Sequence, residues 1–190
     1  MNRRTLIASG VGLLALAACG NDTTSAGPAS SGPGSDHNSQ DAMFAQMMIV
    51  HHEGAVEMSA LAEKQAETAD VKALATRIKK AQTPEIQQMK DWLKAWGEPT
   101  DMPHKNHDMP GMDMHGMNQQ QVMAKLRGLK GKGFERQFLT SMIAHHEGAL
   151  EMAKTEKDRG RNAEALKLAD TIITSQKAEI DEMKGMLAKL

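Results

Sequence analysis

The sequence HHEGAVEM at positions 51–58 returns as HHEGALEM at positions 145–152, 94 residues later. Each copy places two histidines, two glutamates and a methionine at the same spacing. A glycine interrupts each copy, although glycine costs roughly 1 kcal/mol relative to alanine inside a helix. The motif therefore indicates close approach of a neighbouring helix or linker at Gly54 and Gly148. Simple tolerance of glycine in a long, well-packed helix is the alternative.

The motif belongs to a longer internal duplication. Residues 41–96 align with residues 135–190 without a gap, and 20 of the 56 aligned pairs are identical. Apolar residues recur every three or four positions in both copies, which predicts two amphipathic helices per copy. We expect helices over residues 39–68, 70–96, 133–159 and 162–190, with a short additional helix over 118–127. Two helical hairpins bury one apolar stripe per helix best as an all-α four-helix bundle.

The halves of this bundle are not expected to be identical. Pro84 lies inside the second predicted helix, where proline costs about 3 kcal/mol and removes a backbone hydrogen bond. We therefore expect a kink or a break near residues 80–83. The aligned residue in the second copy is Ala178, which carries no such penalty.

The N-terminal residues resemble an export signal rather than part of the fold. Residues 1–18 combine Arg3 and Arg4 with a short apolar run, and the sequence LAAC at 16–19 resembles a bacterial lipobox. This resemblance implies cleavage before Cys19 and lipidation of that residue, which would anchor the protein to the extracytoplasmic face of the cell membrane. An ordinary signal peptide with an incidental cysteine is the alternative. Export by the Sec or the twin-arginine route stays open.

The remaining chain divides by composition. Residues 19–40, rich in Gly, Ser and Asn, are expected to form a flexible tether after the lipidated cysteine. The bundle then occupies residues 41–190, with repeat one at 41–96, a Met- and His-rich linker at 97–133 and repeat two at 134–190. Cys19 is the single cysteine, so an intrachain disulfide is excluded. The formal net charge of −1 gives no electrostatic case for binding nucleic acid.

A helical wheel through the first helix indicates which side chains face the bundle interior. His51 lies on the apolar stripe, His52 lies on its flank, and Glu53 and Glu57 point away. On the second helix Gln82 lies in the stripe and Glu85 lies beside it. The second copy repeats this arrangement, so both halves bring imidazole, amide, carboxylate and thioether groups to faces that should meet. The candidate metal ligands of the bundle are His51, His52, Met48, Met58, Glu85, His145, His146, Met142, Met152 and Glu179.

These residues also have a purely structural interpretation. A buried histidine must find a partner, and a His–Glu or His–Gln hydrogen bond across the helices would supply one. Methionine at helical spacing is often core, and we favour that role for Met89 and Met183. Glu53 and Glu57 are expected to pair with surface lysines or face solvent, with cation binding as the alternative.

The linker carries the clearest soft-metal pattern. Of the 16 methionines in the chain, five lie between positions 102 and 117, together with three histidines. Thioether and imidazole groups together suit Cu(I) or Ag(I). A disordered spacer or a sink for methionine oxidation is the alternative. The candidate ligands are Met102, His104, His107, Met109, Met112, Met114, His115 and Met117.

Motifs of several enzyme classes are absent from the sequence. It contains no cysteine-based zinc pattern and no His-Glu-x-x-His motif. The Glu-x-x-His signature of di-iron bundles is missing before all four paired histidines. No P-loop, dinucleotide fingerprint or nucleophile elbow occurs. No catalytic residue can be assigned, and enzymatic activity is the less favoured interpretation.

The duplicated HHEGA motif, the Gln82, Glu85 and Met89 series, and the sequence MPGM at 109–112 together resemble the bacterial domain-of-unknown-function family DUF305. The resemblance covers about residues 40–190. It implies a ferritin-like four-helix bundle outside the cytoplasm, and some relatives are copper-binding proteins of the cell envelope tied to copper tolerance. Ser141 departs from the pattern, because the first copy has Met47 there.

The sequence thus predicts an extracytoplasmic lipoprotein that binds Cu(I) or Ag(I) for buffering, tolerance or trafficking. One alternative is a ferritin-like metal oxidase that uses His and Glu in the bundle core. Another is a structural or interaction module of the cell envelope without metal. The protein partner, if one exists, is not indicated.

Overall fold

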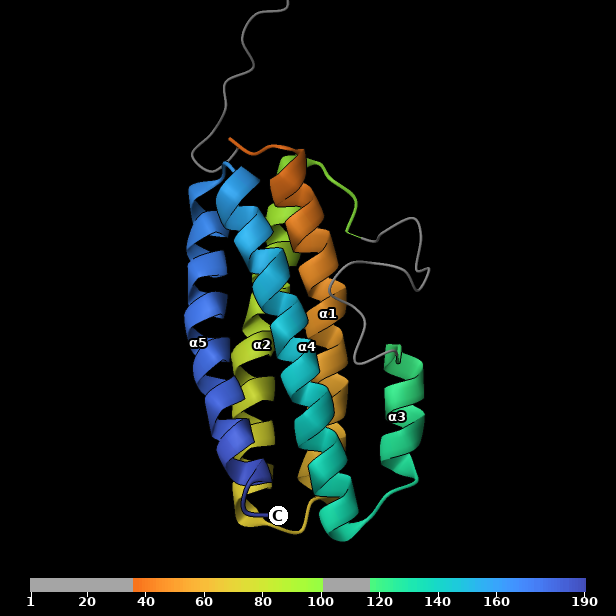
Figure 1. Ribbon diagram of the computed structural model, residues 1–190. Coiled ribbons are helices and arrows are strands. Elements are labelled where there is room, and N and C mark those ends of the chain that lie inside the picture. The colour runs from red at the N-terminus through yellow and green to blue at the C-terminus, as the bar shows by residue number, and fades with distance from the viewer. Residues whose placement is uncertain (1–35, 101–116) are drawn as a thin grey trace, which may run out of the picture. The chain divides into compact units, whose positions relative to one another are not determined.

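The computed structural model describes residues 36–100 and 117–190, and helices dominate this part of the chain (Figure 1). The elements are α1 (Ser39–Gln65), α2 (Ala69–Trp96), α3 (Gln119–Arg127), α4 (Gly131–Arg159) and α5 (Ala163–Leu187). No strand occurs among the described residues. The predicted all-α four-helix bundle is confirmed, with helix ends within three residues of the expected ones. The signal, the lipidation site, nearly all of the tether and the linker ligands from Met102 to His115 lie outside the described residues.

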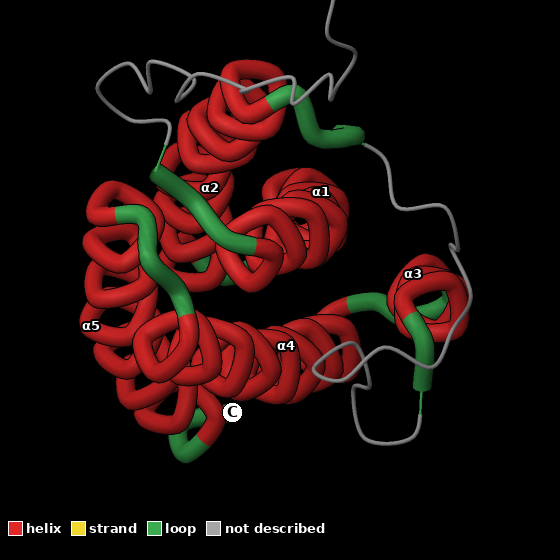
Figure 2. The backbone as a smooth tube through the Cα atoms, turned by 90° about the horizontal axis from the view of Figure 1, so that it is seen from above, coloured by secondary structure: helices red, strands yellow, loops and turns green. Residues whose placement is uncertain are grey.

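The bundle consists of two helical hairpins joined through their first helices. α1 packs on α2 and α4 packs on α5, while α1 also packs on α4. α1 and α4 run in opposite directions, and α3 stands outside the bundle beside them (Figures 1 and 2). None of the described helices is long and apolar enough to cross a membrane.

Of the two outcomes expected near Pro84, a kink or a break, the break is wrong, because α2 continues through Pro84 to Trp96. Pro84 and Lys80 both lie on the exposed side of the helix. The carbonyl of Lys80, which loses its amide donor to the proline, is therefore on the side that water can reach. The helix ends where the sequence predicts, at Gly97, whose φ of 73° is the left-handed conformation that favours glycine.

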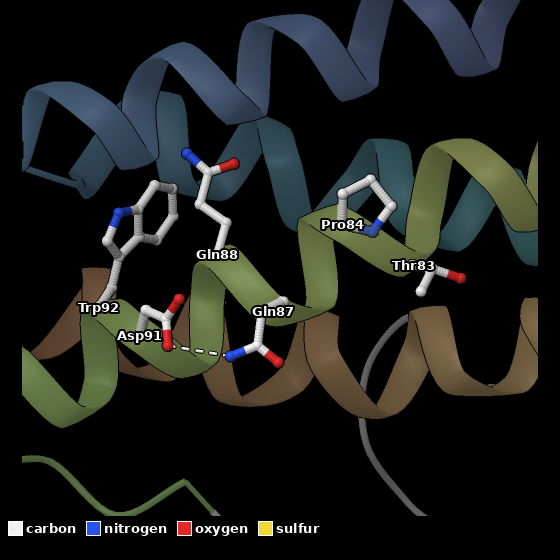
Figure 3. Close-up of a pocket in the computed structure, with 6 residues that line it drawn as sticks. All are labelled: Thr83, Pro84, Gln87, Gln88, Asp91 and Trp92. Atoms are coloured by element: carbon white, nitrogen blue, oxygen red, sulfur yellow. Dashed lines mark hydrogen bonds between the residues drawn. The ribbon is translucent and has the colours of Figure 1, made fainter.

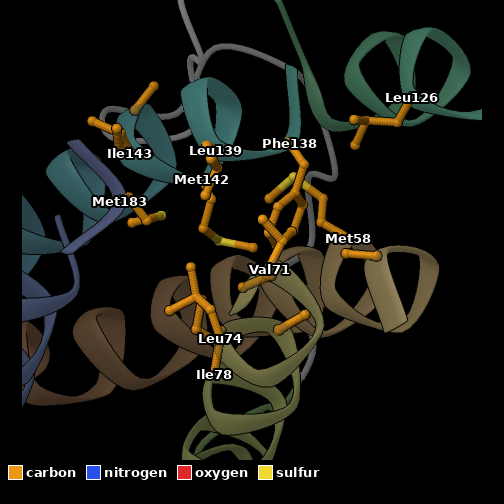
Figure 4. Packing of buried hydrophobic residues seen from close by; sticks show 14 of the residues in the cluster. Met58, Val71, Leu74, Ile78, Leu126, Phe138, Leu139, Met142, Ile143 and Met183 are labelled. Carbon is orange, nitrogen blue, oxygen red and sulfur yellow. The ribbon is translucent and has the colours of Figure 1, made fainter. Parts of the chain in front are cut away.

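Two apolar clusters fill the bundle, one toward each end. One cluster includes Met58, Leu74, Ile78, Phe138 and Met142 (Figure 4). The other includes Phe44, Met48, Met89, Met152 and Ile172. On each long helix, polar residues of the repeat lie between the two clusters, so the bundle has a polar layer at mid-height, which we call the histidine layer. The buried members of this layer are His51, His52, Gln82, His145, His146 and Gln176.

Two buried carboxylates tie the hairpins together in a symmetric way. Asp41, at the start of α1, accepts hydrogen bonds from the backbone amides of Arg161 and Asn162, both at 2.9 Å. Glu135, the aligned residue at the start of α4, accepts from the amides of Glu67 and Thr68 at 2.8 and 2.6 Å. Each first helix therefore holds the turn of the opposite hairpin, and the helix N-termini in these turns gain an acceptor.

One of these contacts contains a second acid. Glu156 of α4 is fully buried beside Asp41, whereas the aligned residue near Glu135 is Ala62. Burial and the hydrogen bond to Asp41 raise the pKa of Glu156 to about 8. The pKa of Asp41 is lowered: burial acts against ionisation, and the hydrogen bonds from Glu156 and the backbone amides outweigh it. The pair therefore holds one proton, on Glu156, at neutral pH.

We expect this proton to make stability depend on pH. Folded Glu156 keeps a proton that the unfolded chain releases near its ordinary pKa of 4.5, so the free energy of unfolding should fall as pH rises from there to about 8. Glu156→Gln, which mimics the protonated acid, should remove this slope. Urea unfolding followed by circular dichroism at pH values between about 5 and 9 measures it. Glu151→Gln, at an exposed position of the same helix, should retain the parental slope. An unchanged slope in Glu156→Gln would contradict the shared proton.

Candidate metal centre in the histidine layer

The first histidine of each motif meets its counterpart at the contact between α1 and α4. The ring centroids of His51 and His145 are 3.6 Å apart, with the ring planes tilted by 43°. Both side chains are buried. The antiparallel packing of α1 and α4 places the two copies of the motif opposite each other, as the inward position of His51 on the helical wheel predicts.

The second histidine of each motif turns toward the second helix of its own hairpin. His52 Nε2 lies 2.7 Å from Glu85 Oε2, and His146 Nε2 lies 2.6 Å from Glu179 Oε2. A carboxylate accepts, so in the neutral imidazole each Nε2 carries the proton and each Nδ1 has the lone pair. Neither Nδ1 atom has a hydrogen-bond partner within the described residues, and both histidines are fully buried. The predicted His–Glu bonds are present, and each of them holds a buried imidazole with its lone pair unused.

The electrostatics of the layer keep an imidazole neutral. Burial holds the pKa of His145 well below its usual range, and the neighbouring His51, His146 and His52 lower it further. A backbone hydrogen bond with His51 acts in the opposite sense and is the smallest effect. His145 is therefore neutral at physiological pH, which is the form that binds a metal ion.

Other polar groups in the layer also lack partners. Gln82 Oε1, Gln176 Oε1 and His145 Nδ1 are buried without a hydrogen bond among the described residues. A buried acceptor left without a donor costs about 1–3 kcal/mol. Several such atoms at one level of the bundle indicate a place where an ion or ordered water completes the set.

The candidate methionines lie in the apolar clusters on either side of this layer. Met48 of α1 and Met152 of α4 belong to one apolar cluster, and Met58 and Met142 belong to the other. All four side chains are buried. The antiparallel helices thus bracket the imidazoles with a thioether pair on each side. Met89 and Met183 are buried core residues, as expected.

The outer glutamates of the motif face away from the layer. Glu53 Oε1 accepts from Lys90 Nζ at 2.8 Å, and Glu57 Oε1 accepts from Arg127 Nη2 at 2.9 Å. Each of these four side chains is exposed by more than a third. This agrees with the surface role that the helical wheel predicts for both glutamates, and it leaves them outside the interior donor set.

No group of three or more His, Asp, Glu or Cys side chains in the described part of the chain is arranged to hold one ion. The two glutamates of the layer are already bound to histidines, so hard-metal coordination by several carboxylates is not available there. Imidazole nitrogens flanked by thioethers remain, and these are ligands for soft ions. His52 and His146 also have the carboxylate-to-imidazole bond that commonly orients a metal-binding histidine.

The layer is an interior feature rather than a surface pocket. A wide, open pocket of about 680 Å³ lies on α2 instead (Figure 3). Gln87 Nε2 donates to Asp91 Oδ1 at 2.9 Å on this surface. The lining includes no residue of the histidine layer and consists of Thr83, Pro84, Gln87, Gln88, Asp91 and Trp92. The pocket's shallow surface offers no converging metal ligands.

Two features of the layer differ from the sequence prediction. His52 was placed on the flank of the stripe, but it is fully buried because α1 meets α4 on one side and α2 on another. Gln119 of α3 was not singled out, yet its amide lies against Gly54, where an added Cβ would come within 3.0 Å of Gln119 Oε1. The close approach expected at Gly54 is therefore confirmed. Of the linker methionines, Met117 is the one within the described residues, and it packs against the apolar cluster that contains Met58.

The family model for the domain of unknown function DUF305 matches residues 41–187. The chain belongs to the DUF305 family. A secreted-type DUF305 protein of Streptomyces coelicolor has 34% identity and a TM-score of 0.72, with 79% of this chain and 91% of that chain covered. A DUF305 fragment from Deinococcus radiodurans has 32% identity and a TM-score of 0.70, covering 80% and 98%. No curated protein matches the chain.

A third similar structure is the protein CopM in its Cu(II)-bound form. It has 35% identity and a TM-score of 0.66, with 78% of this chain and 96% of that chain covered. CopM is also known in a Cu(I)-bound form, in silver-bound forms and in an apo form. Copper and silver binding is thus a property of a family member with the same fold.

The imidazole–carboxylate pairs should contribute measurably to stability. Glu85→Ala leaves the buried His52 Nε2 proton without an acceptor, and we expect a loss of about 1–3 kcal/mol in the free energy of unfolding. Glu179→Ala should cost a similar amount at His146. Glu53→Ala, which removes an exposed pair with Lys90, should cost less than about 1 kcal/mol. Urea unfolding of the three metal-free variants makes the comparison. Equal effects of Glu85→Ala and Glu53→Ala would contradict the buried pair.

Proposed function

We propose that this chain is a lipid-anchored protein on the extracytoplasmic face of the cell membrane that binds Cu(I), or Ag(I) by the same chemistry, in copper buffering, tolerance or trafficking. The observation that carries the proposal is the histidine layer. His52, His145 and His146 are buried and have Nδ1 atoms without a hydrogen-bond partner among the described residues, and the apolar clusters on either side of them contain four methionine thioethers. Such a set of donors is suited to a soft monovalent ion.

The proposed ligands form two groups. In the bundle an ion is bound by histidine nitrogens of the layer, fewer than three to one ion, together with thioethers from among Met48, Met58, Met142 and Met152. Glu85 and Glu179 hold His52 and His146 in the tautomer that exposes Nδ1. The second group consists of the methionines and histidines between positions 102 and 117, which suit the same ions. This choice of ions is supported by the similarity of the chain to CopM, which has been solved with Cu(I) and with silver bound.

The donors do not favour the metal oxidase alternative. A di-iron centre needs several carboxylates, but Glu85 and Glu179 are bound to histidines and Glu53 and Glu57 pair with surface cations. The purely structural alternative stays testable, since the two His–Glu bonds would be present in it as well. Metal stoichiometry separates these readings.

Titration of the mature protein with Cu(I) against a chromophoric chelator should give a nonzero stoichiometry. A double variant Glu85→Gln and Glu179→Gln, which loses the carboxylate partners of the histidines, should weaken binding in the bundle by about 10- to 100-fold. Glu53→Gln, outside the layer, should bind as the parent does. A stoichiometry of zero in the parent would refute the proposed function.

A second variant assigns the sites. With residues 102–117 made free of methionine and histidine, the bound copper should fall but not vanish, because the histidine layer remains. A variant with His52→Gln and His146→Gln should lose the copper bound in the histidine layer and keep the copper bound by residues 102–117. Unchanged stoichiometry in the first variant would place all binding in the bundle. Retained iron with oxygen consumption would instead favour the oxidase.

The proposed anchor is tested separately. Cys19→Ser should move the full-length protein from the membrane fraction to the soluble extracytoplasmic fraction, because a lipidated cysteine is the proposed attachment point. Copper stoichiometry should be unaffected. A membrane-bound Cys19→Ser protein would contradict the lipid anchor and leave the metal proposal intact.

A further inference from the structure

Three groups converge where α1 carries Gly54 at the level of the histidine layer. A Cβ atom added to Gly54 would lie 3.0 Å from Gln119 Oε1 and 3.2 Å from His145 Nε2. Both distances are closer than ordinary van der Waals contact. The missing side chain therefore leaves a gap in the wall of α1 that the Gln119 amide fills, against the edge of the His145 ring.

Gln119 is held in this gap by its amide nitrogen. Nε2 donates to the carbonyl of Gly54 at 3.1 Å and to Glu57 Oε2 at 3.2 Å. The amide oxygen is buried and has no hydrogen-bond partner in the described part of the chain. The Gln119 side chain thus fills the gap with its amide nitrogen making two hydrogen bonds and its amide oxygen making none among the described residues.

The helix that carries Gln119 is weakly attached. α3 has nine residues and packs on α1 and α4 from outside the bundle (Figures 1 and 2). Val122, Met123 and Leu126 bury its inner face, and Arg127 pairs with Glu57 on its exposed side. A helix of this length is marginal without tertiary contacts, so local release of α3 costs less than opening the four-helix bundle.

The duplication provides an internal comparison. Gly148, the counterpart of Gly54, is partly exposed, whereas Gly54 is buried. α3 belongs to neither repeat, so the two sides of the layer are covered differently.

We infer that Gln119 is the cover of the histidine layer, and that Cu(I) or Ag(I) reaches His145 through the gap beside Gly54 when the Gln119 end of α3 moves away. This inference rests on the proposed function for its ions, but the covering of His145 can be measured without metal. Gln119 acts here as a positioning residue that controls access and is not itself a ligand.

Labelling of the metal-free mature protein with diethyl pyrocarbonate, followed by peptide mapping, reports access to His145. Gln119→Ala removes the cover and both hydrogen bonds, so His145 should be modified about 5- to 30-fold faster. Gln119→Glu keeps the size but places a carboxylate beside Glu57 and loses the amide donor, so it should act in the same direction. Gln120→Ala, at the exposed neighbouring position of α3, should label at the parental rate.

Circular dichroism and the urea midpoint establish that each variant is folded before labelling. An unchanged His145 rate in a folded Gln119→Ala protein would overturn the inference, as would an equal increase in Gln120→Ala. Acceleration confined to the Gln119 variants supports it.

The metal experiment follows the same variants with Ag(I) as the probe. Stopped-flow loading should be faster in Gln119→Ala than in the parent, at equal final stoichiometry. If the parent takes up no Ag(I) or Cu(I), the proposed function fails while the labelling result still decides whether Gln119 covers His145. Equal loading rates together with faster labelling would overturn the assignment of this gap as the route of the ion.

Discussion

The hydrogen bond between a buried imidazole and a carboxylate, formed once in each hairpin, is the interaction on which the polar centre of the bundle depends. Four histidines lie at mid-height in an apolar bundle, where a polar group without a partner costs free energy. Glu85 and Glu179 satisfy His52 and His146 from the neighbouring helix. Each bond also fixes the tautomer, so satisfying Nε2 leaves Nδ1 as a buried lone pair. The same His–Glu hydrogen bond that lowers the cost of burying the imidazole therefore leaves its Nδ1 available to a ligand.

The duplication explains why this layer lies where it does. Antiparallel packing of α1 on α4 brings the two copies of the motif together, so His51 lies against His145 with tilted rings. Each apolar cluster also contains one candidate methionine from each copy. The same relation places Asp41 and Glu135 on the opposite turns. The two halves differ from each other at Glu156, at Pro84 and at α3. These departures are where the protein gains a shared proton at one end and a cover over one side of the layer.

Periodicity was sufficient to predict the four long helices, the short fifth helix and the inward position of His51, because those depend on one stripe per helix. It placed His52 on the flank because a single stripe assumes one neighbour, whereas α1 is covered by α4 and by α2. The break expected at Pro84 does not occur, since the cost of proline depends on whether the freed carbonyl is exposed. Glu156 and Gln119 gave no periodic signal, because their partners Asp41 and Gly54 are 115 and 65 residues away.

A buried polar layer of this kind lowers the free energy of unfolding but places potential ligand atoms inside the bundle. An apolar replacement would avoid the desolvation of four imidazoles and two amides, and proteins often gain stability from such a change. The unpaired Nδ1 and Oε1 atoms keep a cost that a bound ion or water would offset. Binding would then be coupled to bundle stability, because an ion held by the folded layer stabilises the native state in proportion to its affinity. The carboxylates are occupied and thioethers lie in the clusters on either side, so a bound soft monovalent ion would offset this cost without additional anions in the interior.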